Sequence, residues 1–275
     1  MNKEWKILLS VVLFALPFFV PIFHVEFDVA TVVTVTSLFF AILLGFFIAG
    51  ATSNYLRMQT LVATEDANFM AIYNYTCLIA KEKKKAVADA IDAYFIEVLE
   101  FASLGYADDT RDELDKVIAV VDTVLSKDDN GRTLYQNLHN AKTQLYATNQ
   151  ETVLTSKTIV SSRHWAILIT LTILIILLAL ALRDGTIIWN AVIGVLFIVM
   201  FQTLILVHEV DSNIFLANQF KYGPPQAVFA AIGRLPYYPE LAEKKGYLKN
   251  KPRPFRVGYT KMTKKGPVRT IKVIK

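Results

Sequence analysis

Cysteine is nearly absent from this chain of 275 residues, and so are the motifs of common catalytic sites. Cys77 is the single cysteine, which excludes an intramolecular disulfide framework, and we expect it to be a buried structural thiol. The chain also lacks a glycine-rich phosphate loop, a His-Glu-x-x-His pair and a nucleophile elbow. We therefore expect neither an enzyme nor a bound cofactor.

Charge is nearly absent from four blocks, at residues 7–23, 29–51, 165–182 and 187–207. A helix needs about 20 apolar residues to cross the hydrocarbon core of a bilayer, with a range of about 17–25. All four blocks are predicted to span the membrane, the first only just. The first block follows Lys3 and Lys6 as a signal peptide would, but its length, its prolines and the lack of a small-residue cleavage site favour a retained helix.

Lysine and arginine are scarce in the two short loops that join these blocks. The loop at 24–28 has neither, and the loop at 183–186 has only Arg183, whereas the N-terminus, the central segment and the end of the chain carry the rest. Cytoplasmic flanks of membrane spans are enriched in these residues. We predict a multi-pass protein of the plasma (inner) membrane with both termini in the cytoplasm.

Residues 52–164 have the composition of a helical domain, with twelve Lys/Arg and sixteen Asp/Glu. Proline is absent from 29–80, so the second span is predicted to continue as one helix far beyond the bilayer. Apolar residues recur at helical spacing in 87–99 and 114–125, and a polar helix is expected to run unbroken from Thr133 into the third span. The predicted fold is an all-α membrane protein with a cytoplasmic helical bundle inserted between its second and third spans.

The last segment, 208–275, is predicted to be a basic cytoplasmic tail, with fourteen Lys/Arg against four Asp/Glu. Within it, 255–262 and 268–274 flank a Lys-Lys-Gly-Pro turn and predict a β-hairpin. Because the tail begins where the last span ends, we expect it to contact anionic lipid headgroups in preference to the competing polyanion, nucleic acid. The residues expected at the lipid surface are Lys244, Lys245, Lys249, Lys251, Arg253 and Arg256.

The second span holds the candidate residues for an ion pathway. Polar side chains past its end fall near one helical face, with Glu65 at its edge: Arg57, Thr60, Thr64, Asn68 and Tyr75. They are interpreted either as a pore vestibule or as ordinary interhelical hydrogen bonds. Phe39 and Phe46 would either meet lipid or narrow a pore, and Ala41, Gly45 and Ala49 have the small-xxx-small spacing of closely packed membrane helices.

An acidic cluster follows the fourth span. Glu209, Asp211 and Asn213 alternate as oxygen ligands do in a calcium loop, but the EF-hand spacing is absent. We therefore favour a hydrogen-bonded cluster at the membrane interface over a Ca²⁺ site. The adjacent His208 is a pH-sensor candidate by residue type alone.

The layout of two spans, a helical insert and two further spans resembles the bestrophin-like family of bacterial membrane proteins. Arg57 and Glu65 after the second span, Trp165 at the head of the third, and Asp211 with Phe215 after the fourth are similar to positions of that family. Bestrophins proper are pentameric anion channels whose second helices line the pore and whose last span is followed by an acidic calcium clasp. The resemblance covers 1–220 in layout and leaves the basic tail outside.

The resemblance implies a homo-oligomeric membrane protein, with five copies as the family's number, that passes ions, and anions in particular, along its second helix. The alternative is a non-conducting membrane anchor or scaffold whose bundle and basic tail bind a partner. The polar residues after the second span favour a channel, whereas the long basic tail favours an anchor.

Overall fold

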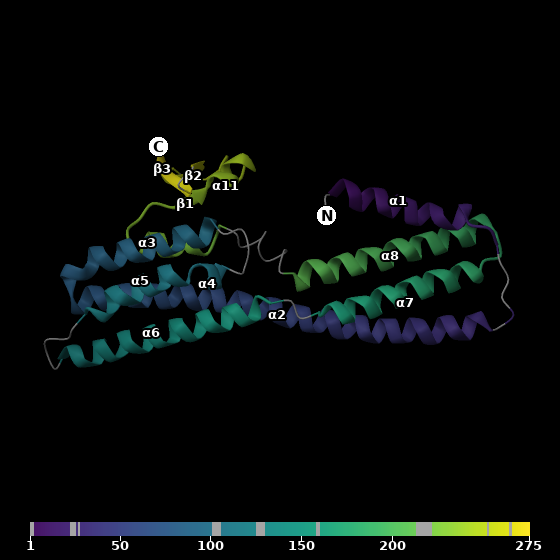
Figure 1. Ribbon diagram of the computed structural model, residues 1–275, viewed down its shortest axis with the longest axis horizontal. Coiled ribbons are helices and arrows are strands. Elements are labelled where there is room, and N and C mark those ends of the chain that lie inside the picture. Colours follow the sequence, from purple (N-terminus) through teal and green to yellow (C-terminus); the bar gives the residue numbers. More distant parts are fainter. Residues whose placement is uncertain are drawn as a thin grey trace. The chain divides into compact units, whose positions relative to one another are not determined.

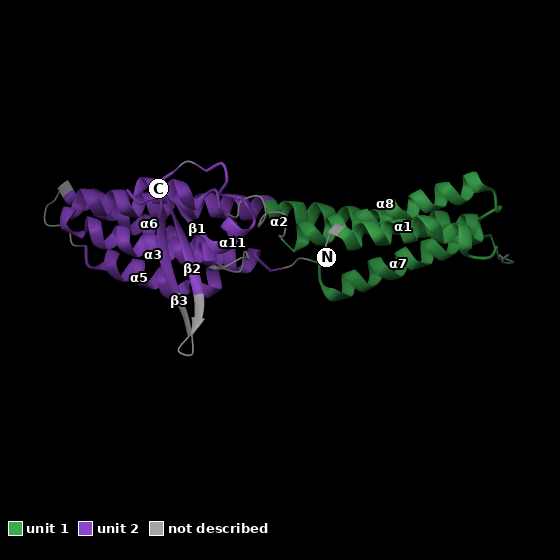
Figure 2. Cartoon of the chain, turned by 90° about the horizontal axis from the view of Figure 1, so that it is seen from above, with its two compact units in different colours: residues 1–55, 158–212 green, residues 56–157, 213–275 purple. Residues whose placement is uncertain are grey.

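The computed structural model describes residues 3–22, 26, 28–100, 106–124, 130–157, 160–212, 222–251, 253–263 and 266–275. The chain divides into two compact units, shown in different colours in Figure 2. We call them the membrane unit (residues 1–55 and 158–212) and the globular unit (residues 56–157 and 213–275). One long helix, α2, belongs to both, since it begins in the first and ends in the second.

The membrane unit contains four helices, which run alongside one another in Figure 1. They are α1 (Lys3–Phe19), the first part of α2 (Val29–Ile79), α7 (Ser162–Ala181) and α8 (Ile187–Asp211). By length and composition, α2, α7 and α8 are each apolar enough to cross a membrane. α1 has 17 residues, or about 26 Å of helix, and is the shortest of the four.

Packing within the membrane unit is centred on α8. It contributes Phe197 to a buried cluster with α1 and α7, and Met200 to a second buried cluster with α2 and α7. At Gly194 the backbones of α8 and α1 approach so closely that a Cβ atom would lie 2.6 Å from the carbonyl oxygen of Phe14. Only glycine fits this position without moving α1.

An arginine in the loop between α7 and α8 completes the end of α1. Pro21 has no backbone N–H, so the carbonyl of Pro17 lacks the donor that a helix would normally supply four residues on. The buried Arg183 guanidinium donates to that carbonyl, and also to the carbonyls of Val20 (2.9 Å) and Pro21 (2.8 Å). Arg183 therefore satisfies the carbonyls left unpaired at a helix C-terminus, where a positive charge is favourable.

The globular unit is built mainly of helices, with a small sheet near the C-terminus (Figure 1). Its elements are the second part of α2, η1 (Lys81–Lys83), α3 (Lys84–Glu100), α4 (Tyr106–Asp109), α5 (Arg111–Asp122), α6 (Asn130–Thr155), α10 (Pro225–Ala231), β1 (Tyr237–Pro239), α11 (Glu240–Lys244), β2 (Phe255–Thr263) and β3 (Gly266–Ile274). The continuous α2 has 51 residues and is about 77 Å long, which confirms the prediction from its lack of proline.

The core of the globular unit lies between α2, α3 and α5. The ring of Phe69 on α2 packs against Tyr94 and Phe95 on α3, with centroids 4.7 and 4.9 Å apart. Phe95 in turn meets Phe229 of α10, so the C-terminal part of the chain joins the same core. The apolar faces predicted for α3 and α5 are buried as expected.

β2 and β3 form the antiparallel hairpin that the sequence predicted, while its turn lies outside the described residues. The short β1 pairs in parallel with β2 and was not predicted. Together with α10 and α11 these strands form what we call the C-terminal module, the described part of residues 222–275. Its buried Tyr237 and Val257 belong to the core that contains α3, so the predicted tail is part of the globular unit rather than a separate segment.

The polar helix does not continue into the third span, so the prediction of one unbroken helix from Thr133 is wrong. The polar helix α6 ends at Thr155, and a new helix, α7, begins at Ser162. Ser161 caps α7 by accepting a hydrogen bond from the backbone N–H of His164, and the backbone N–H of Val160 donates to Asp211. Serine and threonine side chains compete with helical backbone bonds, which explains a break in this Ser/Thr-rich stretch.

Candidate functional site

α2 carries an exposed stripe that continues from residue 31 to residue 67. Its members recur every three or four residues and so lie on one helical face: Thr31, Val35, Leu38, Ile42, Gly45, Ala49, Thr52, Leu56, Thr60, Ala63 and Ala67. We call this face the α2 stripe. Most of its side chains are small or carry a hydroxyl group, and the described part of the chain leaves them uncovered.

The aromatic and small residues predicted within the second span lie on or beside the α2 stripe. Phe39 and Phe46 flank it, with 60% and 71% of their surface exposed. Ala41 is exposed on its other side, and Gly45 and Ala49 belong to it. A Cβ atom at Gly45 would meet nothing within 4 Å, so these small residues mediate no helix packing inside the described chain.

Arg57 lies beside the α2 stripe and forms an ion pair with α6. Its Nε donates to the carboxylate of Glu151 at 2.6 Å, and both side chains are well exposed. The hydroxyl groups of Thr60 and Thr64 donate to the carbonyls of Leu56 and Thr60, at 3.2 and 2.8 Å. These threonines keep their hydrogen bonds within α2, as hydroxyl groups on an exposed helix face commonly do.

Glu65 and Asn68 do not share the exposed face, so a pore vestibule does not fit these two residues, whereas the alternative of interhelical hydrogen bonds fits Glu65. Both are buried in the core of the globular unit, with 1% and 6% of their surface exposed. The hydroxyl of Tyr94 donates to the Glu65 carboxylate at 2.5 Å. The predicted polar face is therefore divided, with Glu65 and Asn68 turned inwards and Arg57 and Thr60 exposed.

Next to them, Asp66 is a buried acid that sequence reasoning did not single out. Its burial, together with the neighbouring Glu65 carboxylate, raises the pKa of Asp66 to about 8. Two amide atoms of this core, Asn68 Nδ2 and Asn149 Oδ1, have no hydrogen-bond partner among the described residues. The signal in the sequence was two adjacent acids, Glu65 and Asp66, just ahead of the aromatic stretch that forms the core.

The acidic residues after the fourth span have separate partners. Glu209 forms an ion pair with Lys6 of α1, and the Asp211 carboxylate accepts from the backbone N–H of Val160 at 3.0 Å. Asn213 lies outside the described residues, as does Phe215. Among the residues that are described, no group of three His, Cys, Asp or Glu side chains is placed to hold a metal ion.

The six cations predicted to contact lipid have different surroundings. Both terminal nitrogens of Arg256 donate to the Asp92 carboxylate, at 2.7 and 2.6 Å, and the pair is largely buried. This corrects the prediction for Arg256, which is held against α3. Lys244 pairs with Glu240 one turn earlier on α11, at 2.7 Å. Arg253 donates to the backbone oxygen of Lys275 at 2.9 Å. The remaining three have no ion pair with a described acid: Lys245, Lys249 and Lys251.

The helical hairpins, the long α2 and the helical insert define a class, that of α-helical membrane proteins with a globular part between their second and third hydrophobic blocks. Comparison with known proteins narrows this class. The bestrophin-like domain family matches residues 8–212, and the chain belongs to the bestrophin-like family. A comparison with curated proteins finds no match.

Solved structures of similar fold include two crystal structures of substituted variants of a membrane protein. Each has a TM-score of 0.60 and 13% sequence identity, and covers 85% of this chain and 99% of its own. A sequence identity of 13% shows only that the fold is shared. The agreement in fold extends beyond the family match, since 85% of the chain is longer than residues 8–212.

Proposed function

We propose that the protein is a homo-oligomeric ion channel whose pathway is lined by the α2 stripes of several copies. The observation that carries this proposal is the continuity of the stripe, which runs from the apolar part of α2 to the polar part beyond Ala51 without being covered by the described chain. Contact with lipid alone would not explain the α2 stripe, because the stripe continues into the globular unit. There it is still uncovered and still rich in small and hydroxyl side chains. Membership of the bestrophin-like family supports the same proposal.

The proposed assembly places equivalent α2 helices around an axis, in five copies by resemblance to bestrophins. Gly45 and Ala49 would permit close approach there because they have little side chain. Phe39 and Phe46 would form the narrow apolar section, since a ring of large apolar side chains obstructs ions by excluding water. Arg57, just beyond it, would favour anions at the mouth of the pathway.

We further propose that α1 crosses the membrane, so that the protein has four spans and both termini in the cytoplasm. α1 packs along α8 through the buried cluster that contains Phe197, and its outward residues Trp5, Leu8 and Val12 are apolar and exposed. A helix of 17 residues is at the lower limit for a span, which is about 17 residues. The proposed activity is transport, with no catalytic step.

The proposal is tested with purified protein in liposomes loaded with chloride. Phe46→Ala should raise the flux per oligomer by about tenfold, because removing a constriction worth about 1.4 kcal/mol speeds passage by that factor. The matched control is Phe19→Ala on α1, a phenylalanine that is 83% exposed and lies away from the α2 stripe. It should leave the flux unchanged.

Three results would contradict the proposal. One is a folded protein that passes neither anions nor cations, which would favour the membrane anchor. Another is a monomer in mild detergent and in nanodiscs, because one copy encloses no axis. The third is an equal change in flux for Phe46→Ala and Phe19→Ala, which would mean that the effect comes from the lipid-facing surface.

A further inference from the structure

The C-terminal module separates its cations onto two sides. One side faces α3, where three arginines each meet an acid: Arg234 pairs with Asp89, Arg256 with Asp92 and Arg269 with Glu97. Arginine suits this role because its planar fork binds carboxylates through two parallel hydrogen bonds. These pairs hold the module on the acidic surface of α3, which leaves the charges of that side neutralised.

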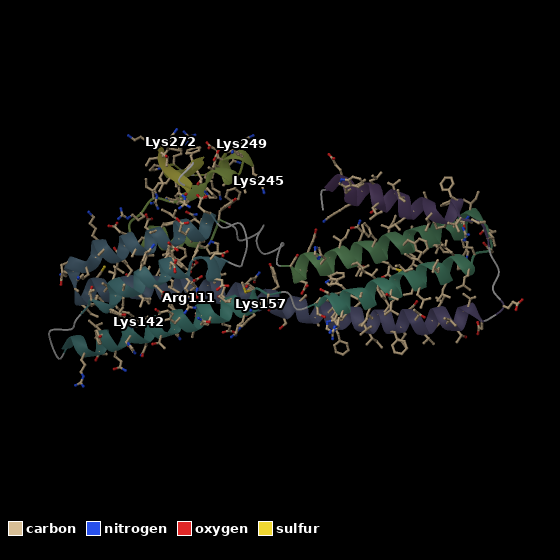
Figure 3. The ribbon with its side chains drawn as sticks, viewed as in Figure 1. Arg111, Lys142, Lys157, Lys245, Lys249 and Lys272 are labelled. Atoms are coloured by element: carbon tan, nitrogen blue, oxygen red, sulfur yellow. The ribbon has the colours of Figure 1, made fainter. Side chains whose placement is uncertain are left out.

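The other side carries cations without such partners. In the hairpin, Lys272 lies opposite Val257 in register and alternates with Ile271 and Val273, so it projects from the face opposite to that of Arg269. Figure 3 shows Lys245, Lys249 and Lys272 along the side of the module that points away from α3. We call this side the basic face. Its cations are Lys245, Lys249, Lys251 and Lys272, none of which forms an ion pair with a described acid.

Apolar and aromatic groups accompany the cations of the basic face. Leu241 on α11 and Tyr247 after it are 40% and 42% exposed. The Lys251 ammonium lies 4.3 Å from the centre of the Tyr247 ring, and the Lys272 ammonium lies 5.1 Å from that of Tyr259. Tyrosine together with lysine and an exposed leucine is typical of surfaces that lie at the boundary between lipid headgroups and acyl chains.

We propose that the basic face docks onto anionic lipid headgroups of the membrane in which the protein is embedded. The chain itself keeps the surface near lipid, because only ten residues lie between Asp211 at the end of α8 and Tyr222, and these eleven Cα–Cα steps reach at most about 38 Å at about 3.5 Å each. Lysine ammonium groups are hydrated point charges, which suits contact with phosphates in a fluid surface better than fixed pairing. This inference does not depend on ion conduction.

The test uses the full-length protein in nanodiscs. A polarity-sensitive fluorophore is attached to Leu241→Cys in a Cys77→Ser background, since Cys77 is the only native cysteine. Discs of phosphatidylcholine are compared with discs in which about one third of the lipid is phosphatidylglycerol, and the emission is expected to shift to shorter wavelength only in the anionic discs. High salt should reverse the shift, because screening weakens headgroup attraction.

The decisive variant is Lys245→Glu/Lys249→Glu/Lys272→Glu. Three cations lost from a membrane surface should lower the ratio of docked to undocked module by at least on the order of 100-fold, which abolishes the shift. The matched control is Lys81→Glu/Lys85→Glu/Arg132→Glu, an equal change of net charge at residues that are outside the basic face, and it should keep the shift. Equal unfolding midpoints of the two triple variants would exclude misfolding as the cause. The milder change of Lys245, Lys249 and Lys272 to glutamine should also reduce the emission shift.

Other outcomes would overturn the proposal. The same emission in both kinds of disc would show that anionic lipid is not bound. Equal loss in the control triple would attribute the effect to net charge rather than to the basic face. A shift on adding an RNA oligonucleotide to neutral discs, with none in anionic discs, would assign the basic face to nucleic acid instead.

Discussion

Asp66 is the residue whose chemistry differs most from its ordinary behaviour. Burial, with a smaller contribution from Glu65, raises its pKa to about 8 in the folded protein, whereas an unfolded aspartate titrates at about 3.9. Between these values the folded state holds a proton that the unfolded state has released. Stability therefore falls as the pH rises through this window, by up to about 1.4 kcal/mol per pH unit.

Replacing Asp66 by asparagine should flatten that pH dependence. The unfolding midpoint of Asp66→Asn in detergent should exceed that of the original protein at pH 8, and the two should converge as the pH falls towards about 4, because below about 3.9 the carboxyl group is neutral in both the folded and the unfolded state. The control is Asp108→Asn at an exposed position of α4. An unchanged slope in Asp66→Asn would mean that Asp66 titrates normally.

Sequence reasoning could not identify this acid because burial of a polar residue depends on which elements cover it. Glu65 and Asp66 follow Thr60 and Thr64 on α2, and the spacing placed Glu65 at the edge of the helical face that carries Arg57. Tyr94 of α3, which bonds Glu65, lies 29 residues away in the chain. The partner that turns this part of α2 inwards is set by tertiary packing, which the periodicity of one helix does not contain.

At the scale of elements, the ion pairs between the C-terminal module and α3 should hold the two together. Arg256→Met leaves Asp92 partly buried without its partner, since the two side chains are only 13% and 16% exposed. We expect a loss of about 2 kcal/mol in the free energy of unfolding, below the 3–5 kcal/mol typical of fully buried pairs. Denaturant unfolding and earlier proteolytic release of the module would measure it.

The double variant Arg256→Met/Asp92→Leu should recover most of this loss, because removing both charges leaves neither one desolvated. Lys116→Met, which breaks an exposed pair with Glu113, should have no measurable effect. If the double variant is as unstable as Arg256→Met, then the loss comes from the packing of the Arg256 side chain and its hydrogen bond to the Leu235 carbonyl rather than from an unpaired charge.

Elements with strong local patterns were predictable, and those set by distant contacts were not. The absence of proline predicted the whole of α2, and the alternating residues around a turn predicted the hairpin of β2 and β3. The three residues of β1 include Pro239 and carry no strand pattern of their own. They become a strand because β2 lies beside them, and the basic segment becomes a folded module because acids of α3 lie beneath its arginines.

At the scale of the whole molecule, the family and the apolar helices agree on a membrane protein, and topology is the next property to establish. Arg183 affects the topology prediction, which rests on counting Lys and Arg near the ends of the spans. It is the only cation of the loop at 183–186, yet its guanidinium is buried against the carbonyls at the end of α1. It therefore does not behave as a free loop charge, and the excess of Lys and Arg at the opposite ends of the helices is sharper than the sequence count suggests.

The four-span topology predicts the accessibility of single cysteines in a Cys77→Ser background. A membrane-impermeant maleimide should label Glu26→Cys and Asp184→Cys in intact cells, because both loops are expected outside. Glu82→Cys, in the exposed turn between α2 and α3, should react only after the membrane is opened. The pair of loop positions separates two alternatives: if Asp184→Cys is labelled from outside and Glu26→Cys is not, then α1 lies along the membrane instead of crossing it. Labelling of Glu82→Cys alone in intact cells would show that the protein has the opposite orientation. The basic face would then meet the lipid of the outer leaflet instead of the cytoplasmic one.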